Sequence, residues 1–154
     1  MKHLLSALLT VTLFISCSKD KDEVKDYTAQ NEKEITDYLA QNNLTATRTD
    51  SGLYYIIEEE GDAEGETPLA TSNVTVAYKG YYTNGNVFDQ SDEQGVAFSL
   101  TQVIQGWKEG IRYFKEGGKG KLLVPAHLGY GSKDYQSIPG GSVLIFDIKL
   151  ISIN

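Results

Sequence analysis

From residue 52 onward, one short stretch follows helical spacing while the surrounding segments alternate apolar and polar residues. Ile104, Trp107, Ile111 and Phe114 fall on one helical face, and Gly117-Gly118 is expected to end that helix. A single helix of this size cannot form a core alone, so a curved sheet must wrap around it. The sequence therefore predicts an α+β domain with Trp107 at the junction of helix and sheet.

The predicted strands lie on both sides of this helix, and the domain is expected to start near residue 52. Period-two alternation and turn residues predict strands at residues 53–57, 74–82, 87 onward, 96–100, 121–124 and 144–150. Asn84-Gly85 supplies the positive backbone angles of a tight hairpin. A loop containing Pro and Gly is predicted over residues 125–141. These features favour a mainly antiparallel sheet.

Residues 26–51 are predicted to be an N-terminal helix followed by a polar linker. Tyr27, Ile35, Tyr38 and Leu39 recur near helical spacing among good helix formers. One helix with such a thin apolar stripe is marginal by itself. Two interpretations remain open: two chains associate through the helix, or the helix packs on the domain behind it.

The N-terminus has the layout of a lipoprotein signal peptide, assigned here to residues 1–16. Lys2 and His3 precede an apolar run over residues 4–15, which is too short to cross a membrane that needs about 20 residues. Residues 14–17 resemble a bacterial lipobox, so Cys17 is expected to be acylated after cleavage. The alternative is a soluble export signal with an incidental cysteine. In either case no second cysteine exists for a disulfide.

Residues 17–25 are interpreted as the acylated cysteine and a charged, solvated tether. The charged run at residues 18–23 also resembles the stretch that marks lipoproteins of some Gram-negative lineages for the cell surface. The expected location is the cell envelope of a Gram-negative bacterium, periplasmic or facing outward from the outer membrane. The membrane would be a partner through the lipid on Cys17.

Charge and residue content exclude several function classes. The net charge is −7 and no block of Lys and Arg exceeds two residues, so nucleic-acid binding is disfavoured. The two histidines are His3, in the leader, and His127. They leave neither zinc-ligand spacing nor a Cys-His nucleophile pair. We therefore expect neither a metal nor a cofactor.

Five separated motifs carry a family resemblance. They lie at residues 74–80, 85–89, 103–107, 128–131 and 138–147. In order and spacing the region 52–154 resembles the FKBP prolyl isomerases. The resemblance implies a twisted antiparallel sheet wrapped around one short helix, and peptidyl-prolyl cis-trans isomerase activity that assists the folding of exported proteins. It also implies proline-containing exported polypeptides as substrates and macrolide inhibitors as ligands.

The same resemblance assigns a pocket. Trp107 would form its floor, Tyr130 would offer a hydroxyl to a substrate carbonyl, and Ile138 would close over the site. Ile104 would add its backbone amide and Asp89 a polar rim. The implied walls are Tyr78, Phe88, Val103, Ile104 and Phe146, supported by Val96 and Phe98. Without the resemblance, Trp107 and Phe146 would equally fit ordinary core positions.

Rotation of an X-Pro bond needs no nucleophile, because the barrier comes from amide conjugation. The scarcity of His and Cys is therefore compatible with isomerase activity. One alternative is a non-catalytic chaperone or adhesion module that binds proline-containing segments. Another is a surface lipoprotein that captures glycans, indicated only by the leader and tether.

Overall fold

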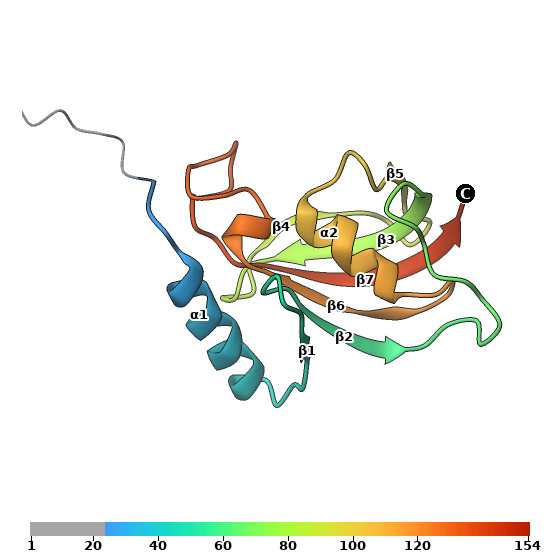
Figure 1. Ribbon diagram of the computed structural model, residues 1–154, viewed down its shortest axis with the longest axis horizontal. Helices are drawn as coiled ribbons and strands as arrows, with labels where there is room; N and C mark the ends of the chain where they lie inside the picture. Colours follow the sequence, from blue (N-terminus) through green and yellow to red (C-terminus); the bar gives the residue numbers. More distant parts are fainter. Residues whose placement is uncertain (1–23) are drawn as a thin grey trace, which may run out of the picture.

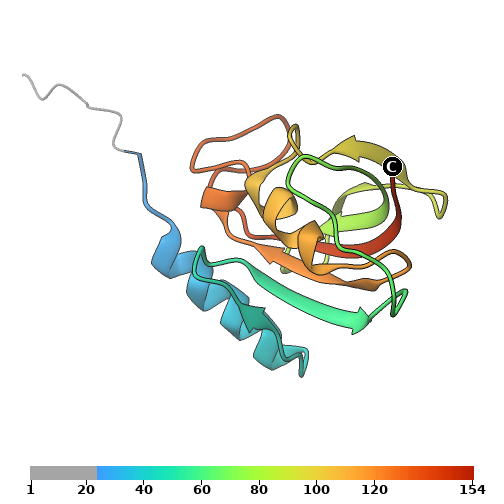
Figure 2. The same ribbon diagram turned by 45° about the vertical axis from the view of Figure 1, so that its right-hand side comes forward.

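The computed structural model describes residues 24–154, in which one antiparallel sheet carries a helix on each face (Figures 1 and 2). The strand order is β1-β2-β6-β7-β3-β4, and β5 also pairs with β3. The strands are β1 (Thr47–Arg48), β2 (Tyr54–Glu59), β3 (Asn73–Tyr81), β4 (Val87–Gln90), β5 (Val96–Ser99), β6 (Lys119–Val124) and β7 (Leu144–Ile153). The ten-residue β7 lies between β6 and β3 and forms the centre of the sheet. The predicted α+β class is confirmed.

On the inner face lies α2 (Gln105–Gly110), continued by the 3-10 turn η1 (Ile111–Tyr113). Gly106 and Gly110 allow this helix to approach β6 closely, because a Cβ on Gly106 would lie 2.5 Å from the Val124 side chain and one on Gly110 would lie 2.6 Å from that of Leu122. The predicted helix is thus present but shorter than expected. It ends at Tyr113, and Phe114 is already extended, with φ −97° and ψ 145°.

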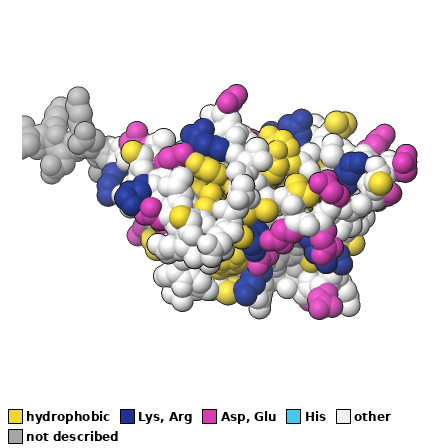
Figure 3. Space-filling model, turned by 90° about the horizontal axis from the view of Figure 1, so that it is seen from below, with side chains coloured by type: hydrophobic (Ala, Val, Ile, Leu, Met, Phe, Trp, Pro, Cys, Tyr) yellow, Lys and Arg dark blue, Asp and Glu magenta, His cyan; other side chains and the backbone are white. Residues whose placement is uncertain are grey.

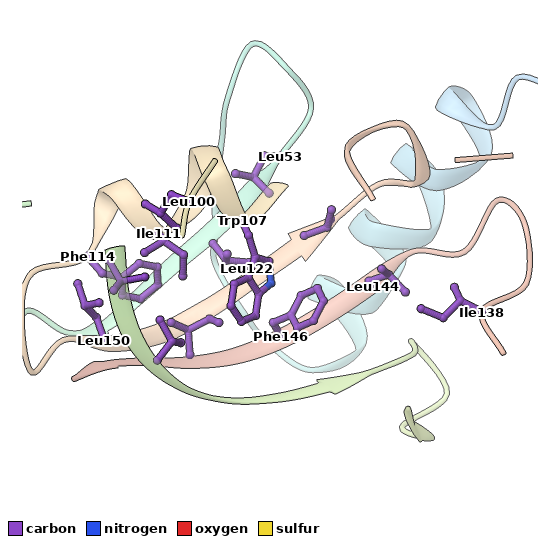
Figure 4. Packing of buried hydrophobic residues seen from close by; sticks show 14 residues of the cluster. Leu53, Leu100, Trp107, Ile111, Phe114, Leu122, Ile138, Leu144, Phe146 and Leu150 are labelled. Atoms are coloured by element: carbon purple, nitrogen blue, oxygen red, sulfur yellow. The ribbon is translucent and has the colours of Figure 1, made fainter. Parts of the chain in front are cut away.

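The inner core fills the space between α2 and the sheet (Figure 4). Side chains from one face of β3, β6 and β7 meet the apolar face of the helix, as the alternation of the strands requires. Trp107 is 4% exposed, and Phe114 remains buried although it has left the helix. The buried members of this cluster are Leu53, Val74, Val76, Leu100, Trp107, Ile111, Phe114, Leu122, Val124, Ile138, Leu144, Phe146, Ile148 and Leu150.

The outer face of the sheet is covered by α1 (Thr28–Gln41), which lies on the side opposite α2 (Figure 2). Ile35 and Leu39 pack against the alternate side chains of the same strands. The other buried residues of this second cluster are Tyr54, Tyr81, Leu123 and Ile145 in the strands and Val143 just before β7. Of the two interpretations of the N-terminal helix, packing on the domain is the arrangement observed within this chain. The predicted linker contains β1, whose Thr47 pairs with Tyr55.

A polar cluster fixes the register of α1 on the sheet. Tyr54 donates its hydroxyl to Glu32, and the Arg48 guanidinium binds the same carboxylate at 3.0 Å. The hydrogen bond from Tyr54 is the main reason that the pKa of Glu32 lies below its usual value. Thr83, beyond the end of β3, donates to Glu34 at 2.6 Å. The helix is therefore attached at several points along its length.

The expected signal peptide at residues 1–16, the acylation site Cys17 and most of the tether lie outside the described residues. Among the helices of residues 24–154, none has the length and apolar character needed to span a membrane. On the face seen in Figure 3, acidic and basic side chains of the described residues are interspersed.

Candidate functional site

A hollow of about 270 Å³ opens beside α2 at the inner face of the sheet. Its walls come from segments far apart in the sequence: β3, β4, β5, the turn before α2, the loop after β6, and β7. The lining residues are Tyr78, Phe88, Asp89, Phe98, Gln102, Val103, Ile104, Trp107, Tyr130, Tyr135 and Phe146. Nine of them belong to the set that the sequence predicted.

Trp107 lies at the centre of a box of aromatic rings. The rings of Tyr78, Phe98 and Phe146 stand nearly perpendicular to the indole, with centroid distances of 5.1, 5.2 and 5.3 Å. Phe88 contacts Phe146 edge to face at 5.6 Å. Edge-to-face pairs of this kind are favourable and hold each ring in one orientation. The arrangement forms an apolar floor with upright walls, suited to a small apolar ring.

The rim carries the Asp89 carboxylate, which already accepts a hydrogen bond. The Tyr78 hydroxyl donates to Asp89 at 2.6 Å, which joins β3 to β4 across the opening. Burial is the main cause that raises the pKa of Tyr78, with the Asp89 carboxylate adding to it. Ser91 fixes the backbone of Tyr78, since the Tyr78 amide donates to the Ser91 hydroxyl at 3.0 Å. Sequence reasoning assigned no role to Ser91.

Ile104 presents a backbone amide at the edge of the hollow. It is extended, with φ −57° and ψ 153°, and immediately precedes α2. Its carbonyl accepts hydrogen bonds from the amides of Trp107 and Lys108. Within residues 24–154, its own amide meets no acceptor. The Trp107 indole N–H, which is buried, likewise meets no acceptor in the described part of the chain.

Tyr130 and Tyr135 form a stacked pair on the loop after β6. Their ring centroids are 4.7 Å apart and their planes differ by 11°. Both rings line the hollow although each is more than a third exposed. Burial is the main cause that raises the pKa of Tyr130, and Tyr135 adds to the effect. The Tyr130 hydroxyl therefore stays protonated at neutral pH and can donate a hydrogen bond.

Two residues of the predicted set lie outside this lining. Val96 is 44% exposed and pairs with Val76 across β5 and β3, so it does not support the pocket as expected. Ile138 is 9% exposed and packs into the inner core instead of lining the hollow. It exchanges two backbone hydrogen bonds with Tyr135, each 2.9 Å long. Ile138 thus anchors the loop to the inner core.

Two lining residues, Gln102 and Tyr135, were not assigned to the site from the sequence. Gln102 directly precedes the predicted wall residue Val103, so its position in the motif was a usable signal. Tyr135 lies in an irregular loop, where no periodicity tells which way a side chain points.

Comparison with known proteins identifies the family of this chain. Residues 64–151 match the family described as FKBP-type peptidyl-prolyl cis-trans isomerase. This chain therefore belongs to the FKBP family.

Among its relatives is the FKBP-type peptidyl-prolyl cis-trans isomerase FkpA of Buchnera aphidicola subsp. Schizaphis graminum, 47% identical over 70% of this chain and 43% of the relative. FkpA of Escherichia coli K12 is 41% identical over 67% of this chain and 38% of the relative. The crystal structure of Escherichia coli FkpA superposes with a TM-score of 0.72 at 35% identity, covering 82% of this chain and 61% of the other. The chain thus spans less than half of the length of these two relatives.

Proposed function

We propose that this protein is a peptidyl-prolyl cis-trans isomerase that assists protein folding by rotating X-Pro bonds in the ring-lined hollow. The observation that carries the proposal is the aromatic box around Trp107, open to solvent and flanked by the amide of Ile104. Membership of the FKBP family supports the same activity.

The geometry suits rotation about an amide. The proline ring would lie on the indole of Trp107 between the upright rings, with Ile104 and Tyr130 donating hydrogen bonds to carbonyls of the flanking peptide. The barrier of about 18–20 kcal/mol comes from the conjugation of the amide. An apolar wall disfavours the charge-separated resonance form that creates this conjugation, so the twisted amide is stabilised relative to the planar one. Asp89 would orient Tyr78 at the rim.

The required acceleration is modest. An X-Pro bond isomerises alone in tens to hundreds of seconds, and about 1.36 kcal/mol of barrier reduction speeds it tenfold. Binding the proline ring in a fixed orientation, together with two directed hydrogen bonds, is enough for several such tenfold accelerations.

A protease-coupled prolyl peptide assay tests the proposal with the variants Trp107→Leu and Tyr78→Ala. Both remove an aromatic surface of the hollow, and we expect kcat/KM to fall at least tenfold, or about 1.4 kcal/mol. Circular dichroism and urea unfolding establish that the variants are folded at the assay temperature. Full activity in folded variants would reject the hollow as the site. Binding of prolyl peptides by the unaltered protein without acceleration would favour a non-catalytic module.

We propose further that the protein is exported to the cell envelope and held there by a lipid on Cys17, where its substrates would be exported polypeptides with X-Pro bonds. The leader-like residues 1–16 and the lipobox-like ending support this location. Cys17→Ala should release the protein from isolated membranes into the soluble fraction. Unchanged retention would contradict lipid anchoring.

Macrolide inhibitors are proposed as ligands of the same hollow, on the strength of family membership and of its aromatic lining. Titration with a macrolide, followed by Trp107 fluorescence, would measure their affinity.

A further inference from the structure

Asn31 is the single buried polar side chain of residues 24–154, with no exposed surface. It belongs to α1, whose apolar side chains pack on the outer face of the sheet. Asn31 instead reaches the pocket loop, which we define as residues 125–142 between β6 and β7. A buried amide is unfavourable unless both its donor and its acceptor are satisfied. Here both are satisfied by the backbone of the pocket loop.

The hydrogen bonds of Asn31 close a ring at the base of this loop. Its side-chain oxygen accepts from the amide of Ala126 at 2.8 Å, and its side-chain nitrogen donates to the carbonyl of Gly141 at 2.9 Å. Ala126 in turn accepts from the amide of Gly131 at 2.8 Å, and Gly131 accepts from the amide of Gly141 at 2.9 Å. Asn31 therefore bridges the two ends of the loop and, through them, its middle.

The bridge begins where the sheet stops. The last pair between β6 and β7 is Val124 with Leu144, so the strands no longer hold each other beyond that point. Gly141 has φ +80°, and the space where its Cβ would lie is taken by the ring of Tyr27 at the start of α1. A side chain at Gly141 would thus meet α1 as well as a strained backbone angle.

The middle of the ring lies next to the site. Gly131 follows Tyr130, whose ring lines the hollow and stacks on Tyr135. A fixed amide and carbonyl at Gly131 restrict the backbone that aims the Tyr130 hydroxyl. Loss of the bridge would leave the loop held by its own backbone hydrogen bonds, by the contact of the His127 ring with the Ser51 carbonyl at 2.8 Å, and by Ile138 in the inner core.

We propose that Asn31 is a positioning residue for the isomerase site: through it, α1 holds the base of the pocket loop and so aims Tyr130 at the substrate carbonyl. This inference rests on the proposed function. It assigns the N-terminal helix a part in activity as well as in the packing of the outer face.

The first test compares Asn31→Leu with Ile35→Val. Leu is similar to Asn in shape but makes neither hydrogen bond, whereas Ile35→Val trims a buried α1 residue that packs on the sheet. Both are assayed at a temperature where each is fully folded. Asn31→Leu is expected to lower kcat/KM about fivefold, the worth of one misplaced hydrogen bond, while Ile35→Val stays within about twofold. Equal losses, or no loss in either variant, would show that the hydrogen bonds of Asn31 have no special part in activity, and would overturn the inference.

A double-mutant cycle tests whether Asn31 acts through Tyr130. In the Tyr130→Phe background, the Asn31→Leu change should cost less than about twofold, because the hydroxyl that it aims is already absent. Multiplied losses in the double variant would overturn the proposed route.

Amide hydrogen exchange gives a readout that needs no substrate. Asn31→Leu should speed exchange at Gly131 and Gly141 at least about tenfold and leave Leu122 in β6 unchanged. Unchanged exchange at Gly131 would overturn the inference whatever the activity. If the unaltered protein proved inactive while this exchange effect held, the proposed function would fall and the link between Asn31 and the loop would stand.

Discussion

At the scale of single residues, the two tyrosines at the rim of the hollow differ in what their hydroxyls do. Tyr78 donates to Asp89, whereas the Tyr130 hydroxyl meets no partner within residues 24–154. Of these two hydroxyls, only that of Tyr130 is available to a substrate. Their rings also differ in setting, since Tyr78 contacts Trp107 and Tyr130 stacks on the exposed Tyr135.

Removing each hydroxyl in turn separates these roles. Tyr130→Phe should lower kcat/KM about fivefold, because one hydrogen bond to the substrate is worth roughly 1 kcal/mol. Tyr78→Phe keeps the wall of the hollow and frees a solvent-exposed carboxylate, so we expect a change within about twofold. The prolyl peptide assay measures both. A larger loss for Tyr78→Phe would mean that the Tyr78–Asp89 pair takes part directly.

The pKa of Tyr130 predicts the pH dependence of the reaction. Burial raises this pKa, so the neutral, donating hydroxyl persists above its ordinary value of about 10. The isomerisation rate should therefore be flat between about pH 6 and pH 9 and fall only at higher pH. NMR exchange spectroscopy on a prolyl peptide measures this without a coupling protease. A decline between pH 7 and pH 9 would be inconsistent with Tyr130 as the donor.

The sequence predicted the floor and walls of the site better than its edges. Trp107, Tyr78, Phe88 and Phe146 were assigned through the family resemblance of their motifs, because periodicity alone would equally have placed Trp107 and Phe146 in an ordinary core. Val96 failed as a supporting residue because alternation gives the face of a strand but not how far the sheet curves at its end. Tyr135 was not assigned to the site because its place depends on the stack with Tyr130, a contact without periodicity.

At the scale of elements, the approach of α2 to β6 depends on Gly106. Gly106→Ala should raise helix propensity by about 1 kcal/mol, but the new methyl group would meet the branched side chain of Val124. Overpacking of this kind costs about 1–3 kcal/mol, so we expect a net loss of stability. We also expect shifted Trp107 fluorescence, because Trp107 is the next residue of α2. Urea unfolding measures the first effect; a stabilised variant would refute this account.

Elements were predicted with boundaries less certain than their existence. The short helix was expected to continue to Gly117, but it tightens to a 3-10 turn and stops at Tyr113. Phe114 kept its apolar spacing because it fills the core from an extended segment, which periodicity does not distinguish from a last helical turn. The strand β1 was hidden in a polar linker because its two residues are both exposed.

At the scale of the whole molecule, α1 packs on the sheet of the FKBP domain, so the helix and the domain should unfold together. Ile35→Ala removes a fully buried side chain between them and should lower the free energy of unfolding by about 2–5 kcal/mol. The exposed residue Asp37 on the same helix offers a matched control, Asp37→Ala, with little expected effect. Urea titration followed by both circular dichroism and tryptophan fluorescence should show coincident transitions. An earlier, separate loss of helix signal would contradict a single cooperative unit.

The amide of Ile104 has a bearing on which peptides such a hollow can accept. The Ile104 amide and the Tyr130 phenol are both hydrogen-bond donors, so a bound peptide must supply acceptors. An ordinary residue brings a backbone N–H donor together with its carbonyl acceptor. Proline is the residue whose backbone nitrogen carries no hydrogen within a peptide chain. Any other residue bound at the same position would bury its backbone N–H among aromatic faces without an acceptor. This penalty favours proline over other residues through the backbone nitrogen alone.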